Sequence, residues 1–192
     1  APEAAALYCP NAAEQSPSCM TPTPNCETYC ELVETACVGE QGQYLSAFNF
    51  MGDPNYRPHC EATCAALPPG ELPGDDGHSV ACRQRQAAMA LSDPVAASEH
   101  CEAAGPSGGD VCGTGCEAYC SLALALCDAD ALGDPLFEDE AACMAACEAY
   151  PTADGSDSLA CRLHQLTLPP ANAGGGMGEG ADVPLYSYRC AD

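Results

Sequence analysis

Apolar residues recur at helical spacing along much of the chain, with polar residues between them. The first stretch of this kind begins after Asn25, a favourable N-cap, and ends at Gly39, a favourable stop. Its apolar positions share one face of a helix: Cys26, Tyr29, Cys30, Val33 and Cys37. Glu27, Glu31 and Glu34 would face water. The pattern therefore predicts an amphipathic helix whose buried stripe is rich in cysteine.

Further helices are indicated by the same periodicity and by capping residues. Pro58 suits the first turn of a second helix, Ser79 is a cap for a third over about 80–91, and Thr114 and Glu117 are spaced as a capping box. Two more helices are predicted around the pair Cys143 and Cys147 and after Ala160. Residues 183–190 alternate enough to be a short strand or an extended arm.

A frame of cysteines occurs twice. From Cys26 to Cys101 successive cysteines are 4, 7, 23, 4, 18 and 19 residues apart, and from Cys116 to Cys190 they are 4, 7, 16, 4, 14 and 29 apart. The helical spacings match and the loop spacings vary, which is typical of a tandem duplication. We call the two frames the first repeat and the second repeat.

The duplication leads to a fold prediction: a mainly α, small disulfide-rich protein made of two disulfide-stapled helical hairpins with long loops. The natural division is the glycine-rich linker 105–109. We therefore expect a first unit over 1–104, with a proline-rich N-terminal arm, and a second unit over 105–192. The second unit would contain a glycine-rich loop and an extended C-terminal arm.

Two helices in each repeat carry cysteines four residues apart. If two such helices pack antiparallel, two parallel bridges can join them, an arrangement that we call a ladder. The predicted ladder pairs are Cys26–Cys64, Cys30–Cys60, Cys116–Cys147 and Cys120–Cys143. The alternative sets Cys37 against Cys60 and Cys127 against Cys143. Spacing alone leaves both connectivities open.

The ladder leaves further cysteines to be placed. It predicts one bridge to the third helix of each repeat: Cys37–Cys82 and Cys127–Cys161. Seventeen cysteines are an odd number, so at least one is free, holds another group or bonds to another chain. Two repeats of eight cysteines fit if either Cys9 or Cys190 is left over. The odd cysteine is then near a chain end, either as a free or capped thiol or in an intermolecular bond.

Composition indicates a compartment. Cysteine at 17 of 192 residues belongs to disulfide scaffolds, which persist in oxidising surroundings. The chain begins with an alanine-rich stretch at Ala1, which fits a mature end left by signal-peptide removal. We therefore expect a secreted protein, extracellular or at the cell surface. No apolar run approaches the length of a transmembrane helix, so membrane insertion is not expected.

The net charge of the chain restricts the classes of partner that it can bind. Acidic residues number 28 against five basic ones, all arginine, and the net charge is −23. A nucleic-acid partner is excluded because phosphates need a basic face. The simplest interpretation is a solvated acidic surface that keeps the protein in solution. A more specific interpretation is that the acidic surface binds divalent ions, or that the protein assembles only when its charge is screened.

One acidic segment partly matches a calcium-binding loop. It places acidic residues at positions 1, 3, 7 and 12: Asp128, Asp130, Asp134 and Asp139. Gly133 stands at position 6, but Leu132 occupies position 5 and the last ligand is not Glu. An acidic loop that caps a helix is the alternative. Calcium is thus the one cofactor for which the sequence offers candidates, and they are weak.

The sequence contains little that would support a catalytic function. The chain contains no GxSxG or HExxH motif, and its C-x3-C pairs suit helix bridging better than the C-x2-C spacing of redox and zinc sites. We therefore expect a protein that is not an enzyme.

The combined motifs resemble a family. The first repeat reads CxxYC, CxxxC, Ala81-Cys82-Arg83 and then HCxxAGPxGGxxC up to Cys112, and the second repeat matches through Ala160-Cys161-Arg162. This pattern resembles uncharacterised secreted bacterial proteins built from cysteine-rich helical repeats. The resemblance implies a helical repeat fold and no particular activity.

These observations lead to two functional hypotheses of different classes. The first is a structural protein, the repeating subunit of an extracellular filament, tube or surface layer, whose terminal arms contact neighbouring copies. The second is a monomeric secreted module that binds a ligand or calcium through the aromatic connector 44–56 or the acidic loop 128–139. A redox or metal-handling protein is a third, weaker alternative.

Overall fold

The computed structural model describes residues 23–44, 57–71, 77–127, 135–151 and 158–167. These ranges contain seven α-helices, the short 3-10 turn η2 (Gly39–Gln41) and no strand. The helices are α2 (Cys26–Ala36), α3 (Arg57–Ala66), α4 (Val80–Ser92), α5 (Ala97–Ala104), α6 (Gly115–Leu126), α8 (Glu140–Cys147) and α9 (Leu159–Thr167). The predicted fold class, mainly α and stapled by disulfides, is confirmed. The predicted terminal arms lie outside the described residues.

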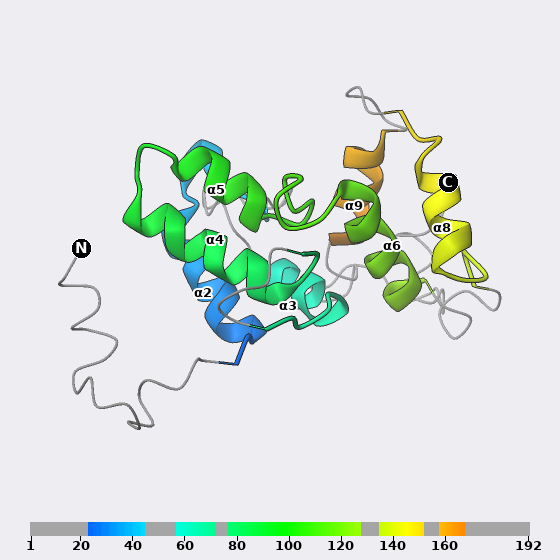
Figure 1. Ribbon diagram of the computed structural model, residues 1–192, viewed down its shortest axis with the longest axis horizontal. Coiled ribbons are helices and arrows are strands. Elements are labelled where there is room, and N and C mark those ends of the chain that lie inside the picture. Colours follow the sequence, from blue (N-terminus) through cyan, green and yellow to red (C-terminus); the bar gives the residue numbers. More distant parts are fainter. Residues whose placement is uncertain (1–22, 45–56, 72–76, 128–134, 152–157, 168–192) are drawn as a thin grey trace, which may run out of the picture.

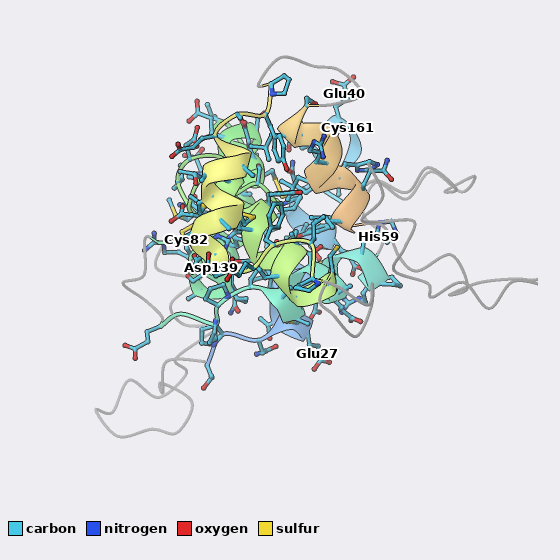
Figure 2. All side chains as sticks on the ribbon, turned by 90° about the vertical axis from the view of Figure 1, so that its right-hand side faces the viewer. Glu27, Glu40, His59, Cys82, Asp139 and Cys161 are labelled. Atoms are coloured by element: carbon cyan, nitrogen blue, oxygen red, sulfur yellow. A yellow bond between two sulfur atoms is a disulfide. The ribbon has the colours of Figure 1, made fainter. Side chains whose placement is uncertain are left out.

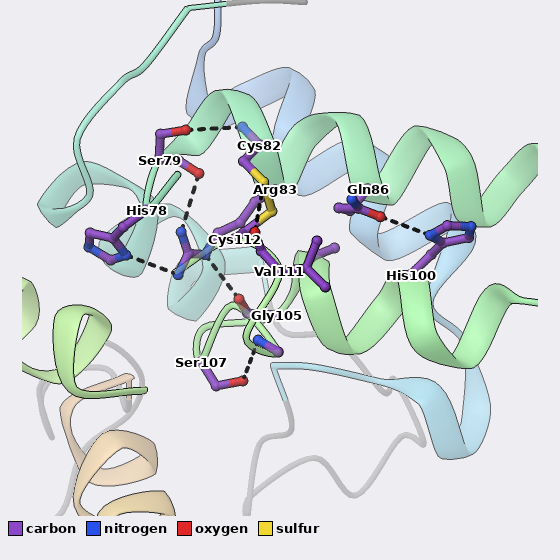
Figure 3. Close-up of a disulfide and its surroundings, with 12 residues drawn as sticks. His78, Ser79, Cys82, Arg83, Gln86, His100, Gly105, Ser107, Val111 and Cys112 are labelled. Atoms are coloured by element: carbon purple, nitrogen blue, oxygen red, sulfur yellow. Dashed lines mark hydrogen bonds between the residues drawn. A yellow bond between two sulfur atoms is a disulfide. The ribbon is translucent and has the colours of Figure 1, made fainter. Parts of the chain in front are cut away.

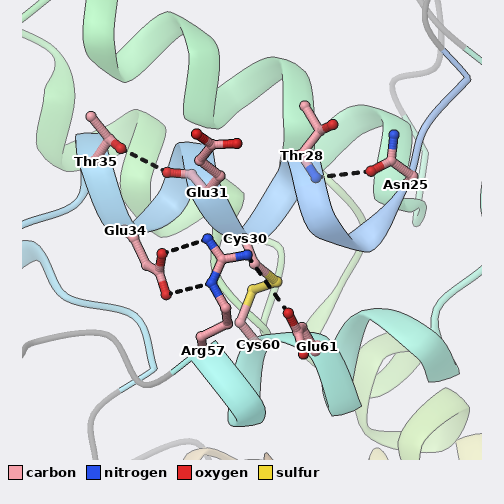
Figure 4. Close-up of polar contacts among 9 residues, drawn as sticks. All are labelled: Asn25, Thr28, Cys30, Glu31, Glu34, Thr35, Arg57, Cys60 and Glu61. Carbon is pink, nitrogen blue, oxygen red and sulfur yellow. Dashed lines mark hydrogen bonds and ion pairs between the residues drawn. A yellow bond between two sulfur atoms is a disulfide. The ribbon is translucent and has the colours of Figure 1, made fainter.

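The first helix, α2, begins as its sequence predicts. The side chain of Asn25 accepts a hydrogen bond from the Thr28 N–H at 2.8 Å, which satisfies a donor at the open end of the helix (Figure 4). Tyr29, Cys30 and Val33 are fully buried on the inner face. The amphipathic pattern has thus turned the cysteine stripe inward, where it can meet α3.

Helix α3 packs against α2 beside a charged pair. The Arg57 guanidinium donates two hydrogen bonds to the Glu34 carboxylate, at 3.1 and 2.7 Å, and lies 3.6 Å from Glu61 (Figure 4). Both side chains of the main pair are partly exposed. Surface ion pairs of this kind contribute about 0–1 kcal/mol, so the pair orients the two helices more than it stabilises them.

Two bridges join the paired helices in each repeat. The first repeat joins α2 to α3, and the second joins α6 to α8. The bonds are Cys26–Cys64, Cys30–Cys60, Cys116–Cys147 and Cys120–Cys143. These are the four predicted ladder bonds, which are confirmed, and they exclude the alternative connectivity. A bridge that acts alone typically stabilises a fold by about 2–4 kcal/mol, mainly by restricting the unfolded chain.

The predicted bridge Cys37–Cys82 is wrong. Cys37 bonds Cys101 on α5, and Cys82 bonds Cys112, which precedes α6. The end of α2 therefore meets α5, while the start of α4 meets the segment that leads into the second repeat. Helix α4 runs between α2 and α5 and contacts both, and the bridge Cys37–Cys101 joins these two neighbours to each other.

The predicted bridge Cys127–Cys161 is also wrong. Cys161 is a free thiol, and Cys127 is disulfide-bonded to a partner outside the described residues. The two candidates for the odd cysteine, Cys9 and Cys190, lie outside the described residues as well. Cys161 is therefore the free thiol that the described part of the chain presents.

Buried side chains form two clusters. One gathers around Tyr29 and Tyr44 with residues of α2 to α5, and the other gathers around Tyr119 with residues of α6, α8 and α9. Figure 1 shows α2, α4 and α5 at one end of the long axis, α6, α8 and α9 at the other, and α3 between them. Helix α3 contacts both α6 and α9. The division into 1–104 and 105–192 stays a prediction.

Among the described residues, no helix combines the length and the apolar character needed to cross a membrane.

Candidate interaction site at the third helices

The third helix of each repeat, α4 and α9, starts in the same way. The Ser79 hydroxyl accepts a hydrogen bond from the Cys82 N–H at 3.1 Å, and the Ser158 hydroxyl accepts one from the Cys161 N–H at 3.2 Å. Serine is a favourable N-cap because its side chain replaces a missing helical acceptor. The two cysteines therefore stand at the same position, three residues after the cap.

The chain also enters both helices alike. The Val80 N–H donates to the Pro68 carbonyl at 2.8 Å, and the Leu159 N–H donates to the Pro151 carbonyl at 3.1 Å. Both acceptors belong to prolines that follow the second helix of the repeat. This second match fixes the correspondence between α4 and α9 residue by residue.

In the first repeat, the start of α4 is fully covered. Ala81, Cys82 and Arg83 have no exposed surface. Helix α5 packs along α4, and residues 105–112 fold back over its first turn, where the bridge Cys82–Cys112 fastens them (Figure 3). The covering segment thus leads directly from the first repeat to the second.

Arg83 lies in a cage of main-chain oxygens beneath this segment. Its guanidinium donates to the carbonyls of Gly105 at 3.1 Å, Ser79 at 3.2 Å and Pro106 at 3.2 Å, and to His78 Nδ1 at 3.4 Å (Figure 3). Burial lowers the pKa of Arg83, although the guanidinium keeps its charge because its normal pKa is so high. A buried cation therefore holds the linker in place through neutral acceptors.

His78 connects this cage to α6. Because an arginine can only donate, Nδ1 of His78 accepts, and the neutral ring carries its proton on Nε2. That nitrogen donates to the Ser121 hydroxyl at 2.8 Å. Burial, with Arg83 as the next cause, lowers the pKa of His78 to about 4. The ring is thus neutral at ordinary pH and joins the two repeats by hydrogen bonds.

The start of α6 forms the other side of the contact between the two repeats, next to His78. The Thr114 N–H donates to the Glu117 carboxylate at 2.6 Å, and the Glu117 N–H donates to the Thr114 hydroxyl at 3.2 Å, which is the predicted capping box. The Thr114 N–H lowers the pKa of Glu117. Gly113, at φ 90°, permits the close approach, because a side-chain carbon there would meet His78 Cβ at 2.6 Å.

In the second repeat, the corresponding face of α9 is open. Ala160 and Gln165 are exposed, whereas their counterparts Ala81 and Gln86 are buried. Among the described residues, α8 and α9 have no companion in the place that α5 takes beside α4. Figure 2 shows Cys161 at the end of α9 that lies away from His59. At the positions of Ala160 and Gln165, the face that is covered in the first repeat is therefore exposed in the second.

Arg162, the counterpart of Arg83, is held differently. Its guanidinium carbon lies 4.3 Å from the centre of the Tyr150 ring, a cation–π contact, and its side chain is only partly buried. Tyr150 meets Tyr119 edge to face, with ring centres 5.5 Å apart. Burial raises the pKa of Tyr119, and the hydrogen bond with Tyr150 adds to the rise. Aromatic rings thus accommodate the cation where the first repeat uses carbonyls.

Tyr29 is the counterpart of Tyr119 in the first repeat, and it contacts the linker directly. Tyr29 donates to the Ala104 carbonyl at 2.5 Å, next to Gly105, and its hydroxyl lies 2.7 Å from that of Tyr44. Burial raises the pKa of Tyr29 to about 12. Tyr29 in the first helix and Arg83 in the third helix therefore both hold the linker by hydrogen bonds to its carbonyls.

The weak calcium candidates are not brought together. Asp128, Asp130 and Asp134 lie outside the described residues. The Asp139 carboxylate accepts the Ala142 N–H at 2.8 Å and caps α8. Within the described ranges, no group of three or more potential ligands could hold a metal ion. Asp139 thus performs the capping role that was the alternative at this position, and calcium binding stays a prediction.

The histidines are likewise dispersed. His59 lies on α3, His100 on α5 and His164 on α9, while His78 precedes α4. His100 Nδ1 lies 2.8 Å from Gln86 Oε1, so its contact is with a neighbouring helix. In the described structure the histidines are placed as individual packing and hydrogen-bonding groups.

Comparison of the chain with protein-family models, with curated proteins and with solved structures finds no match. The resemblance to secreted bacterial helical-repeat proteins accordingly stays a prediction.

Proposed function

We propose that this chain is a non-enzymatic structural protein, the repeating subunit of an extracellular filament, tube or surface layer. The observation that carries the proposal is the open face of α9. Its counterpart on α4 is covered by the segment that leads into the next repeat. In the first repeat this face receives the segment that leads to the next repeat, and on α9 Ala160 and Gln165 are exposed, which favours addition of another copy.

The disulfides support this proposal. Six bridges among the 115 described residues fit an oxidising, extracellular environment. They stabilise a core made largely of alanine and cysteine, which is too small to be stable by packing alone. Secretion with removal of a signal peptide is part of the proposal.

The charge sets the conditions for assembly. Subunits of net charge −23 repel one another at low ionic strength, and divalent ions or acid would reduce that repulsion. We expect the purified protein to form regular assemblies in millimolar calcium or magnesium, or at acidic pH. We expect it to stay dispersed in chelator and low salt at neutral pH.

Negative-stain electron microscopy and light scattering under these conditions test the proposal, with sodium chloride of equal ionic strength as the control for simple screening. Assembly that is equally strong in chelator and low salt would show the charge argument to be wrong. Native mass spectrometry that finds only a monomer with one bound ion would instead favour the ligand-binding or calcium-binding module.

A further inference from the structure

The two repeats meet at a junction formed by the start of α4, residues 105–113 and the start of α6. The six bridges among the described residues divide at Gly113: four lie before it and two lie after it. The bridge Cys82–Cys112 ends one residue short of Gly113, so it fastens the linker to the first repeat only. None of these six bridges therefore ties the second repeat to the first.

Gly113 has the properties of a pivot between the repeats. The helices α2 to α5 precede it, and α6, α8 and α9 follow it. Its φ of 90° lies in the left-handed region, which glycine adopts without the steric cost that a side chain brings. Hinges are a few loop or element-terminal residues that absorb large changes of φ and ψ. A rotation of the second repeat could thus be absorbed at this single residue.

Noncovalent contacts hold the second repeat against the first. His78, which precedes α4, reaches the Ser121 hydroxyl of α6 through Nε2 at 2.8 Å. Helix α3 contacts α6 and α9, and Ala66 near its end packs against the buried cluster of the second repeat. Since the six described bridges permit the repeats to move, contacts of this kind decide whether they do.

His78 fits this junction only while its ring is neutral. Nδ1 accepts a hydrogen bond from the Arg83 guanidinium at 3.4 Å (Figure 3), and an arginine can only donate. A proton on Nδ1 would set an N–H against an N–H and a positive ring beside a positive guanidinium. The ring also lies directly against the pivot, because a side-chain carbon at Gly113 would meet His78 Cβ at 2.6 Å.

Two charged groups of the described structure act on the His78 ring. Arg83 on α4 opposes a proton there, whereas Glu117 on α6 favours one. Burial opposes it more strongly than either charge acts, so the pKa of His78 falls to about 4. The Glu117 carboxylate already accepts the Thr114 N–H at 2.6 Å, which fixes it at the cap of α6. The closed junction therefore disfavours protonated His78 as a whole.

We propose that the junction is an acid-sensitive hinge: when His78 takes up a proton, the start of α6 leaves His78 and the second repeat turns about Gly113. Each repeat stays folded, because each has its own buried cluster and its own ladder. The linker stays on the first repeat, since Arg83 holds the carbonyls of Gly105 and Pro106 without help from His78. The hinge does not depend on the proposed function.

The direction of the switch follows from proton linkage. The half-buried ring of His78 can exchange protons with water, and opening exposes it fully, which restores its ordinary pKa of 6.5. The open form therefore binds a proton more readily than the closed form, and its share grows as pH falls below 6.5. We expect the ratio of open to closed protein to rise roughly tenfold from pH 7 to pH 5.

Residual dipolar couplings of backbone N–H groups measure the orientation of each repeat. The test uses the isotope-labelled full chain in chelator and low salt, in an uncharged alignment medium, at pH 7 and pH 5. Translational diffusion checks that the protein is monomeric. At pH 7 we expect one alignment tensor to fit the helices of both repeats. At pH 5 the second repeat should need a different tensor, while circular dichroism stays unchanged.

Two histidine variants identify the group that responds to pH. His78→Gln keeps a donor and an acceptor but does not titrate, so its alignment should be the same at pH 7 and pH 5. His100→Gln is the matched control, because His100 lies on α5 and its Nδ1 contacts Gln86 within the first repeat. His100→Gln should keep the response of the wild type.

A long-range proton–nitrogen spectrum of the histidine rings adds a second readout. At pH 7 we expect His78 to carry its proton on Nε2, as the contacts with Arg83 and Ser121 require. The tautomer with the proton on Nδ1 would overturn the inference. So would a wild type with one tensor at both pH values, a His78→Gln variant that changes as the wild type does, or a His100→Gln variant that does not change. Loss of helical circular dichroism at pH 5 would show unfolding of a repeat and would equally overturn it.

Discussion

At the scale of single residues, Arg83 is the side chain that hydrogen-bonds the linker to the start of α4. Its guanidinium is fully buried and donates to the carbonyls of Gly105 and Pro106 in the linker and of Ser79 at the start of α4. A buried carbonyl that loses its donor costs more than the hydrogen bond itself contributed. Arg83 therefore helps to hold residues 105–106 over α4, together with Tyr29 and the Cys82–Cys112 bridge.

We expect Arg83→Ala to lower the free energy of unfolding by about 3 kcal/mol, because it leaves carbonyls unsatisfied and opens a cavity. Arg162→Ala is the matched control at the equivalent position. Its side chain is partly exposed against Tyr150, so we expect a loss of about 1 kcal/mol. Guanidinium unfolding followed by circular dichroism, with disulfides intact, measures both. Equal losses in the two variants would contradict the structural difference between the two sites.

His78 makes stability depend on pH. Its pKa is lowered from 6.5 to about 4 in the folded protein, so the unfolded chain binds a proton first as pH falls. The contribution of the neutral ring is complete above about pH 6.5 and is lost progressively toward pH 4. His78→Gln keeps one hydrogen-bond donor and one acceptor but does not titrate.

The difference in free energy of unfolding between wild type and H78Q should therefore be constant above pH 7 and shift against wild type from pH 6.5 to 4. Denaturant unfolding at constant ionic strength measures it, since the net charge of −23 adds its own pH dependence to both proteins. A difference that does not change with pH, or that favours wild type at low pH, would show that His78 is not held neutral by this junction.

At the scale of elements, the two bridges of the first repeat's ladder both join α2 to α3. Once Cys26–Cys64 holds α2 against α3, the ends of the inner loop are already close, and Cys30–Cys60 restricts the unfolded chain only a little further. The reverse holds equally. The two bridges are therefore partly redundant.

We expect removal of either bridge by paired Cys→Ala changes to cost about 1 kcal/mol, and removal of both to cost more than the sum of the two, about 3–4 kcal/mol in all. The comparison needs C26A/C64A, C30A/C60A and the quadruple variant in guanidinium unfolding. The corresponding variants of Cys120–Cys143 and Cys116–Cys147 provide an internal repetition of the test. Strictly additive losses would mean that the bridges act independently.

At the scale of the whole molecule, the sequence predicts what depends on local spacing. The ladders follow from cysteines four residues apart on helices, and the caps of α2, α4 and α6 follow from Asn25, Ser79 and Thr114. These features need only one helix or two similar ones. The caps could be predicted because they depend on local sequence alone. For the ladders, spacing left two connectivities open, and the structure decides between them.

The interaction site depends on longer-range packing, and the sequence predicted it poorly. The bridges of Cys37 and Cys82 require knowing that α5 and not α4 meets the end of α2. Main-chain carbonyls around Arg83 have no sequence signature at all. One pattern could have helped: Cys112 and Cys19 each stand a few residues before the first helix of a repeat.

The bridge across the junction also sets how far the chain can be pulled out under tension. With disulfides intact, a covalent route from Cys26 to Cys147 crosses three of them: Cys26–Cys64, Cys82–Cys112 and Cys116–Cys147. Its peptide portions are only 64–82 and 112–116, which extend to roughly 80 Å at about 3.5 Å per residue. The same span without bridges would reach roughly 420 Å. Under tension between Cys26 and Cys147, the protein would therefore behave as a short tether with little slack.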